Sequence, residues 1–360
     1  MFGALSALIV GRRALHAEES SGEIIDQMVC PPNSSSVRKS EADILELNDG
    51  RLLLVYTDFY TASGDDDAPA QINGRYSSDM GKTWTEPFTI VKNTAKQNVM
   101  SASLLRLKSG EIALAYMYKD SDADCSILFR TSHDEGRTFS DPTKVTPRKS
   151  FWVMNNDRLV QLSTGRLLAP CQRLDNYPMV THSVANVLYS DDNGKSWHES
   201  NSVDIRMNHD GADEPGLVEL KDGRVMMYFR TDLSAIYQCF SSDQGISWTE
   251  PEATRLEAPV SPSIIKRVPA TGDLVVIWNH TLPRHGIGHS DRFPLTSAIS
   301  RDDARTWRNI RDFETDDRYT YAYPSITFSK DRALISYWES IHEQWIGLKV
   351  RSVPTDWFYE

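Results

Sequence analysis

Five short stretches of the chain follow the pattern Ser-x-Asp-x-Gly-x-Thr/Ser-aromatic, the last with Ala in place of Gly, and they are the strongest indication of the fold. They are SSDMGKTW (77–84), SHDEGRTF (132–139), SDDNGKSW (190–197), SSDQGISW (241–248) and SRDDARTW (300–307). Successive copies begin 55, 58, 51 and 59 residues apart, which is typical of a repeat protein. The Asp can accept hydrogen bonds from turn amides, the Gly can adopt a positive φ, and the aromatic ring can pack between neighbouring units. These stretches therefore indicate turns and not a catalytic site.

A second pattern places a polar turn between two apolar runs. It recurs six times, around Gly50, Gly110, Gly165, Gly223, Gly272 and Arg332. Together the two patterns divide the chain into six units of about 60 residues, each with four short strands and no long stretch of helical period. Four-stranded units repeated in a ring form a β-propeller. The sequence therefore predicts an all-β, six-bladed propeller whose two chain ends share one blade.

The composition is that of an acidic globular protein. The 39 Lys and Arg stand against 50 Asp and Glu, a formal charge of −11 over 360 residues, and 40% of the residues are hydrophobic. There is no run of basic residues and no apolar stretch long enough to span a bilayer, so neither nucleic acid nor a membrane is an expected partner. The four cysteines lie far apart and form no CxxC pair, so the sequence signals neither a zinc site nor a disulfide framework.

The first twenty residues stand apart from the repeats. They contain a short apolar run, and Leu15-His16-Ala17 before Glu18 is similar to a cleavage site. We interpret residues 1–20 as a signal peptide or a disordered tail, and residues 21–360 as the propeller. The first alternative implies a secreted or periplasmic protein, and the second leaves a cytoplasmic one open. A monomer is expected in either case.

The Asp-containing stretches at this spacing resemble those of the sialidase (neuraminidase) superfamily, the BNR or Asp-box propellers, over essentially the whole chain. Four further segments resemble the catalytic segments of retaining exo-sialidases. They are DEPGLVELKDGRVMMYFR (213–230) with Glu214 and Arg230, DRFPLTSAISRDD (291–303) with Arg292, YAYPSITFSKDRALISYWE (321–339) with Tyr323, and GDDDAPAQINGRYSSD (64–79) with Asp67.

The resemblance implies a role for each of these residues. Tyr323 would be the nucleophile, Glu214 its base and Asp67 the acid/base residue, while Arg230 and Arg292 would bind the substrate carboxylate. A sialic acid carries its carboxylate on the anomeric carbon, so a neutral phenol can approach where an anionic nucleophile would be repelled. Arginine suits the clamp because its guanidinium binds a carboxylate bidentately. This chemistry requires no cofactor and no metal.

One departure from the family concerns a third arginine. The Arg-Ile-Pro step expected before the first strand is absent, and the nearest arginine is Arg38, twelve residues before Gly50. Either Arg38 reaches the site through a changed loop, or the third carboxylate contact is lost. The second case weakens the argument for sialic acid and favours another acidic or neutral sugar.

Five more polar residues are candidates for contacts with the sugar. By blade symmetry, Asn156, Asp157 and Arg158 belong to the same loop face as Glu214, and His209 and Asp210 precede it in the chain. The sequence thus predicts an exo-glycosidase that hydrolyses a terminal sialic acid, or another terminal acidic sugar, from a glycan. Two rivals stay open: a propeller hydrolase or lyase for another acidic or deoxy sugar, and a non-catalytic propeller that binds glycans or proteins.

Overall fold

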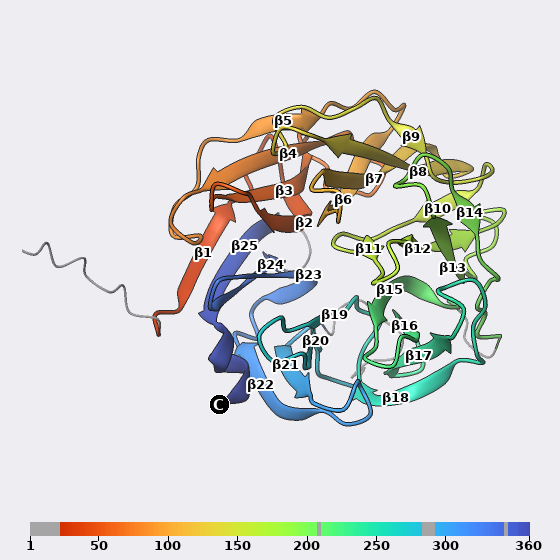
Figure 1. Cartoon of the computed structure of the whole chain (residues 1–360). Coiled ribbons are helices and arrows are strands. Elements are labelled where there is room, and N and C mark those ends of the chain that lie inside the picture. The colour runs from red at the N-terminus through yellow and green to blue at the C-terminus, as the bar shows by residue number, and fades with distance from the viewer. Residues whose placement is uncertain (1–21, 207–209, 283–291, 342–344) are drawn as a thin grey trace, which may run out of the picture.

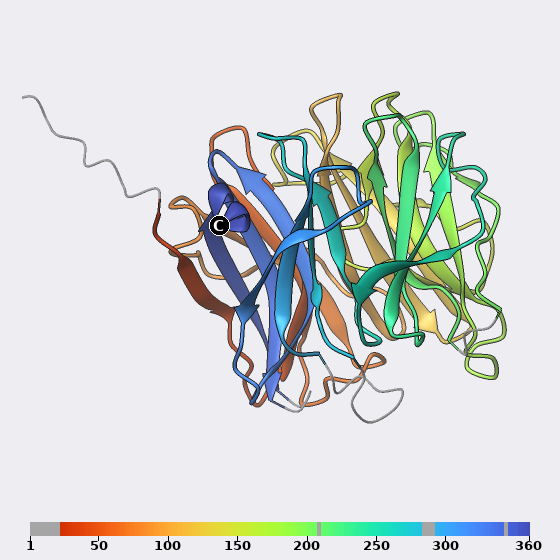
Figure 2. The same ribbon diagram turned by 90° about the horizontal axis from the view of Figure 1, so that it is seen from below.

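The structure, a computed structural model, describes residues 22–206, 210–282, 292–341 and 345–360. Within these ranges every regular element is a strand except one 3-10 turn, η2 (Thr355–Tyr359). The strands are grouped into sheets around a central axis (Figure 1), and the edge-on view shows them running between the two ends of a short cylinder (Figure 2). No helix in this part of the chain is long and apolar enough to cross a membrane. Residues 1–20 and His209 lie outside the described residues.

Six blades of mainly antiparallel strands follow one another around the ring, each beginning with its innermost strand. Blade 1 has β2 (Arg38–Glu46), β3 (Leu52–Phe59), β4 (Ala70–Ser77) and β5 (Phe88–Val91). Blade 2 has β6 (Asn98–Arg106), β7 (Ile112–Ser121), β8 (Asp124–Ser132) and β9 (Thr143–Lys144). Blade 3 has the short β10 (Phe151–Val153) and β11 (Val160–Gln161), then β12 (Leu167–Leu174), β13 (Val184–Ser190) and β14 (His198–Glu199).

The second half of the ring repeats this order. Blade 4 has β15 (Asp213–Glu219), β16 (Val225–Arg230), β17 (Ala235–Ser241) and β18 (Glu252–Glu257). Blade 5 has β19 (Ile264–Arg267), β20 (Leu274–Asn279), β21 (Leu295–Ser300) and β22 (Arg308–Glu314). Blade 6 has β23 (Thr320–Ser329), β24 (Arg332–Ile341) and β25 (Trp345–Pro354), with β1 (Ile25–Cys30) at its outer edge.

The two ends of the chain close the ring by sharing blade 6. Strand β1 pairs antiparallel with β25, from Ile25 opposite Ser352 to Cys30 opposite Leu348. The pairing covers the outer edge of β25, which would otherwise present unpaired backbone groups. The predicted six-bladed propeller with a shared blade is thereby confirmed.

The Asp-containing stretches form tight turns after the third strand of a blade. In the second copy, the Thr138 amide donates to Asp134 Oδ1 at 2.8 Å and the Thr138 hydroxyl donates to Oδ2 at 2.6 Å, while Ser132 Oγ donates to Oδ1 at 2.8 Å. The other four copies repeat the Asp-to-Thr/Ser bonds. In the fifth copy Ala304 holds a φ of 68° where the other copies have glycine. The stretches therefore act as predicted, as structural turns.

Candidate active site

Four innermost strands carry the same irregularity near one end of the propeller. In β2, β6, β15 and β23 the register slips so that two residues on the inner strand lie opposite one on its neighbour. The first bulged residue is Glu41, Ser101, Glu214 or Tyr323, with φ of 43°, 57°, 46° and 56°. A side chain at positive φ is strained by about 1–2 kcal/mol relative to a glycine, and such bulges are enriched beside active sites because they redirect a side chain.

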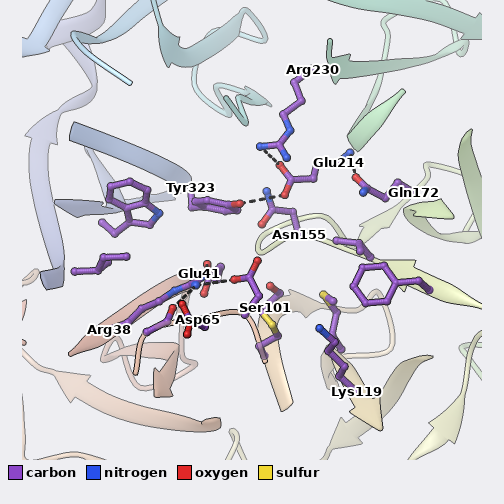
Figure 3. A pocket seen from close by; sticks show the side chains of 18 of the residues that line it. Arg38, Glu41, Asp65, Ser101, Lys119, Asn155, Gln172, Glu214, Arg230 and Tyr323 are labelled. Carbon is purple, nitrogen blue, oxygen red and sulfur yellow. Dashed lines mark hydrogen bonds and ion pairs between the residues drawn. The ribbon is translucent and has the colours of Figure 1, made fainter. Parts of the chain in front are cut away.

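These four side chains meet in one cavity of about 470 Å³. Figure 3 shows Glu41, Ser101, Glu214 and Tyr323 converging on it from different blades. Its charged lining is mixed, with the acidic Glu41, Asp65, Asp66 and Glu214 and the basic Arg38, Lys119, Arg230 and Arg292. Phe151, Tyr177 and Trp338 add aromatic surface. A concave site with a few converging charges and aromatic walls suits a single sugar unit.

The central contact joins the phenol to a carboxylate. Tyr323 Oη donates to Glu214 Oε1 at 3.2 Å, and Arg230 Nη1 lies 3.1 Å from Glu214 Oε2 (Figure 3). Gln172 Oε1 accepts the Glu214 amide at 2.6 Å, which fixes the bulge. Burial, and then the negative charge of Glu214, raise the pKa of Tyr323 above its ordinary value. The phenol is therefore neutral at rest, and it loses its proton only if a base within hydrogen-bond reach accepts it.

Two further groups set the charge around this pair. The Arg292 guanidinium lies 5.6 Å from the centre of the Tyr323 ring and 5.5 Å from that of Trp338. Behind Glu214, the buried Asp213 accepts a hydrogen bond from Ser183 Oγ at 2.6 Å, and burial raises its pKa to about 6. The structure thus brings Glu214, Tyr323, Arg230 and Arg292 of the sequence prediction to one place.

Arg38 also reaches the cavity, although its contacts differ from those of a clamp. Its Nη2 lies 2.5 Å from Glu41 Oε1 and its Nη1 lies 2.6 Å from Asp66 Oδ1. Nη1 also donates to the Gly64 carbonyl at 3.0 Å, and Nε donates to Ser40 Oγ at 2.9 Å. Of the two cases left open by the sequence, the first describes where Arg38 lies, because its side chain reaches the site. Its guanidinium is, however, already bonded to groups of the protein itself.

The acid/base candidate, Asp67, lies beside the cavity and not in its lining. The residues of the aspartate loop that line the cavity are Asp65 and Asp66, whereas Asp67 is not among the lining residues. Asp67 lies at the edge, with its carboxylate on the ammonium of Lys119, a residue that does line the cavity. Arg38 lowers the pKa of Asp66. Three consecutive aspartates in a loop have no fixed periodicity, so the sequence could not show which of them faces inward.

The predicted sugar contacts from blade 3 also need correction. Asn156, Asp157 and Arg158 are buried and absent from the cavity lining. Asn156 Nδ2 donates to the carbonyls of Ala42 and Tyr323, at 2.7 and 3.2 Å, and Asp157 Oδ1 pairs with Lys266 at 2.6 Å. Arg158 Nη2 donates to the Ser263 carbonyl at 2.7 Å. These residues cross-link the inner strands, and the neighbouring Asn155 lines the cavity in their place.

The remaining predicted contact, Asp210, lies outside the cavity lining, and its carbonyl accepts the Ser183 amide at 2.9 Å. Sequence reasoning missed Glu41, Ser101, Lys119 and Gln172. Glu41 and Ser101 had a readable signal, because EAD, SAS, EPG and YPS stand at the four bulges, each before an apolar run. No group of three or more His, Cys, Asp or Glu side chains in the described ranges is arranged to hold a metal ion.

Comparison with curated proteins finds sialidases. A sialidase of Bacteroides fragilis is 23% identical over 349 residues, covering 86% of this chain and 62% of that protein. A sialidase of Clostridium perfringens is 26% identical over 227 residues, covering 56% of this chain and 58% of that protein. The chain thus spans about three fifths of the length of these relatives.

Comparison with solved structures supports the fold. A sialidase of Trypanosoma rangeli, solved with 2,3-difluorosialic acid as a covalent intermediate, has a TM-score of 0.71 at 17% identity, covering 91% of this chain and 59% of that one. A protein of unknown function from Dyadobacter fermentans has a TM-score of 0.72 at 18% identity, covering 92% and 98%. The BNR repeat-like domain matches residues 59–335, more than three quarters of the sequence. The chain therefore belongs to the BNR repeat-like family, within the sialidase superfamily.

Proposed function

We propose that this protein is an exo-glycosidase of the sialidase type, which hydrolyses a terminal sialic acid from a glycan with retention of configuration. The observation that carries the proposal is the hydrogen bond of 3.2 Å from Tyr323 to Glu214, inside a cavity that Arg230 and Arg292 also line. A phenol paired with a carboxylate beside two guanidinium groups matches what a nucleophile needs when its target carbon bears a carboxylate.

The reaction has two steps. Tyr323 Oη attacks the anomeric carbon, its proton passes to Glu214, and the glycosidic bond breaks as the leaving oxygen takes a proton from the acid. Water then attacks the same carbon, gives its proton to the acid/base residue, and releases the sugar while Tyr323 regains its proton. Two displacements at one carbon restore the original configuration.

Asp67 is the proposed acid/base residue, although Asp66 lines the cavity and Asp67 does not. Asp66 is held by Arg38 at 2.6 Å, which lowers its pKa and makes it a poor proton donor near neutral pH. Asp67 pairs with Lys119, and its side chain keeps 57% of its surface exposed. A half-exposed carboxyl group on a loop can turn toward the leaving group when the substrate binds.

A second candidate is a hydrolase for another acidic sugar, and the state of Arg38 favours it. In the sialidase mechanism a third arginine would strengthen the carboxylate clamp, but Arg38 is already bound to Glu41 and Asp66. A substrate whose carboxylate lies elsewhere on the ring would need only Arg230 and Arg292. The natural sugar thus belongs to the acidic sugars under both candidates.

The test is release of a fluorogenic alcohol from α-sialosides and from uronides. We expect turnover of the sialoside by wild type and loss of turnover in Tyr323→Phe, with proton NMR showing the α anomer as the first product. The matched control is Tyr76→Phe, since Tyr76 stacks on Phe88 at 4.9 Å through its ring alone. Turnover of uronides only would establish the second candidate. Absence of turnover on every glycoside, with a folded protein, would contradict both.

A further inference from the structure

In the wall of the cavity, the guanidinium of Arg38 is in direct contact with two carboxylates. Arg38 contributes one positive group, and Glu41 and Asp66 contribute two carboxylates in contact with it, at 2.5 and 2.6 Å. Arg230 and Glu214 lie on the other side of the cavity (Figure 3), and Arg292 lies beside the Tyr323 ring. The two sides therefore differ in what they can bind, because like charges repel at such distances.

The carboxylate of Glu41 is a buried part of this wall and not an exposed group in chance contact with an arginine. Its side chain is 1% exposed, and Oε2 accepts a hydrogen bond from Ser40 Oγ at 2.5 Å while Oε1 holds Arg38. The residue sits at a bulge with a φ of 43°, the same strained geometry that turns Glu214 and Tyr323 into the cavity. Strain of this kind persists only where the surrounding structure holds it.

We propose that Glu41 is a specificity-determining residue: its carboxylate occupies the face of Arg38 that would otherwise bind a sugar carboxylate. The proposal rests on the proposed function, since it assumes that the cavity binds a sugar. A sugar acid is then held by Arg230 and Arg292 alone. At this wall the exposed carboxylate of Asp66 can accept a hydrogen bond from a hydroxyl or amine group of the substrate, whereas an acidic group is repelled.

Binding of an unsaturated sialic acid analogue, 2-deoxy-2,3-didehydrosialic acid, tests this without any need for turnover. Glu41→Gln keeps the shape of the side chain but removes its charge, so Arg38 becomes available to the carboxylate of the analogue. By isothermal titration calorimetry we expect the Kd to fall at least about tenfold. In Arg38→Met/Glu41→Gln this gain should disappear, since the gain depends on Arg38.

Two further variants provide an alternative substitution and a matched control. Glu41→Asn also removes the charge, and asparagine tolerates a positive φ better than most residues, so it covers the case in which Glu41→Gln does not fold. Glu135→Gln is the matched control, because Glu135 also has a positive φ, of 60°, and pairs with Arg106 at 2.6 Å, but it lies beyond the far end of β2. The control should bind the analogue as wild type does.

The outcomes separate this proposal from the proposed function. An unchanged or weaker affinity in both Glu41 variants overturns it, as does a gain that persists without Arg38, or the absence of binding by every variant. Tighter binding by Glu41→Gln supports it even if wild type turns over no glycoside, a result that would count against the proposed function alone.

Discussion

At one end of the propeller, five turns repeat the same side chains, while at the other end four bulges repeat the same backbone and carry three kinds of side chain, Glu, Ser and Tyr. The Asp134 turn and its counterparts use one hydrogen-bond pattern. The bulges carry Glu41, Ser101, Glu214 and Tyr323 at nearly the same φ. Repeated side chains indicate a shared structural task, whereas a repeated backbone with varied side chains indicates a site whose members act differently.

The largest effect is expected from one charge at the bulged end. Glu214→Gln keeps the hydrogen bond to Tyr323 but cannot accept its proton, so kcat/KM should fall by about 10²–10⁴-fold with little change in melting temperature. Glu219→Gln is the control on the same strand. Glu219 lies at the other end of β15 and accepts hydrogen bonds from the Ser163 amide and hydroxyl at 2.7 and 2.5 Å, so its loss should lower stability by about 1 kcal/mol and leave activity unchanged. Equal activities of the two variants would remove the distinction between the ends.

The next effect concerns pH and the buried Asp213. Burial raises its pKa to about 6, so between about pH 4 and pH 6 the folded protein keeps a proton that the unfolded chain releases. Stability therefore falls as pH rises through this window, by up to about 3 kcal/mol in all. Asp213→Asn lacks this dependence. The free energy of unfolding is measured by chemical denaturation at pH 4 and at pH 7. The difference between the variant and wild type should shift in favour of the variant by about 2–3 kcal/mol from pH 4 to pH 7. A difference independent of pH would show that Asp213 is not held protonated.

The turn end should respond to acid in the opposite direction. The Thr138 hydroxyl and amide lower the pKa of Asp134 to about 2, so its contribution is complete above about pH 4 and is lost as pH falls toward 2. Asp134→Ala removes these bonds and should lower the free energy of unfolding at neutral pH by about 1–2 kcal/mol, with glycosidase activity within twofold of wild type. Loss of activity at full stability would mean that this turn does more than hold the blade.

The smallest effect is expected at the irregular fifth turn. Ala304 has a φ of 68°, a conformation that glycine adopts without strain. Ala304→Gly should raise the free energy of unfolding by about 0.5–1 kcal/mol, because relief of the strain exceeds the entropy that a glycine loses on folding. Thermal or urea denaturation measures this directly. A destabilised variant would show that packing of the buried Ala304 methyl outweighs the backbone strain.

The sequence predicted the fold through the turn end, because Asp134 and its counterparts must be the same residue to make the same bonds. It also predicted that Glu214, Tyr323, Arg230 and Arg292 lie at one site, because the segments that carry them resemble segments of a known family. The other residues of the cavity were harder to predict from the sequence. Glu41 was missed because its motif, EAD, shares only the glutamate with EPG and no residue with YPS; their common feature is a place before an apolar run, and the bulge itself appears only in the structure. The expectation for Arg38 did not include the carboxylates that bind it.

Blade symmetry failed at blade 3 for a physical reason. Its inner strand is interrupted between β10 and β11, and the intervening segment turns toward the axis, where Asn156 and Asp157 bond to strands of other blades. A repeat argument assumes that each unit contacts only its neighbours. These residues instead fill the space that all blades share, which no local pattern could show.

The most direct test of the central claim, that Tyr323 is the nucleophile, is to trap it. The protein is incubated with 2,3-difluorosialic acid and digested with trypsin, and the peptide of residues 319–330 is sequenced by tandem mass spectrometry. We expect one sugar adduct, on Tyr323 and not on Tyr319 or Tyr321, and none in Tyr323→Phe. An adduct on Glu41 or Glu214, or no adduct while sialosides are hydrolysed, would contradict it.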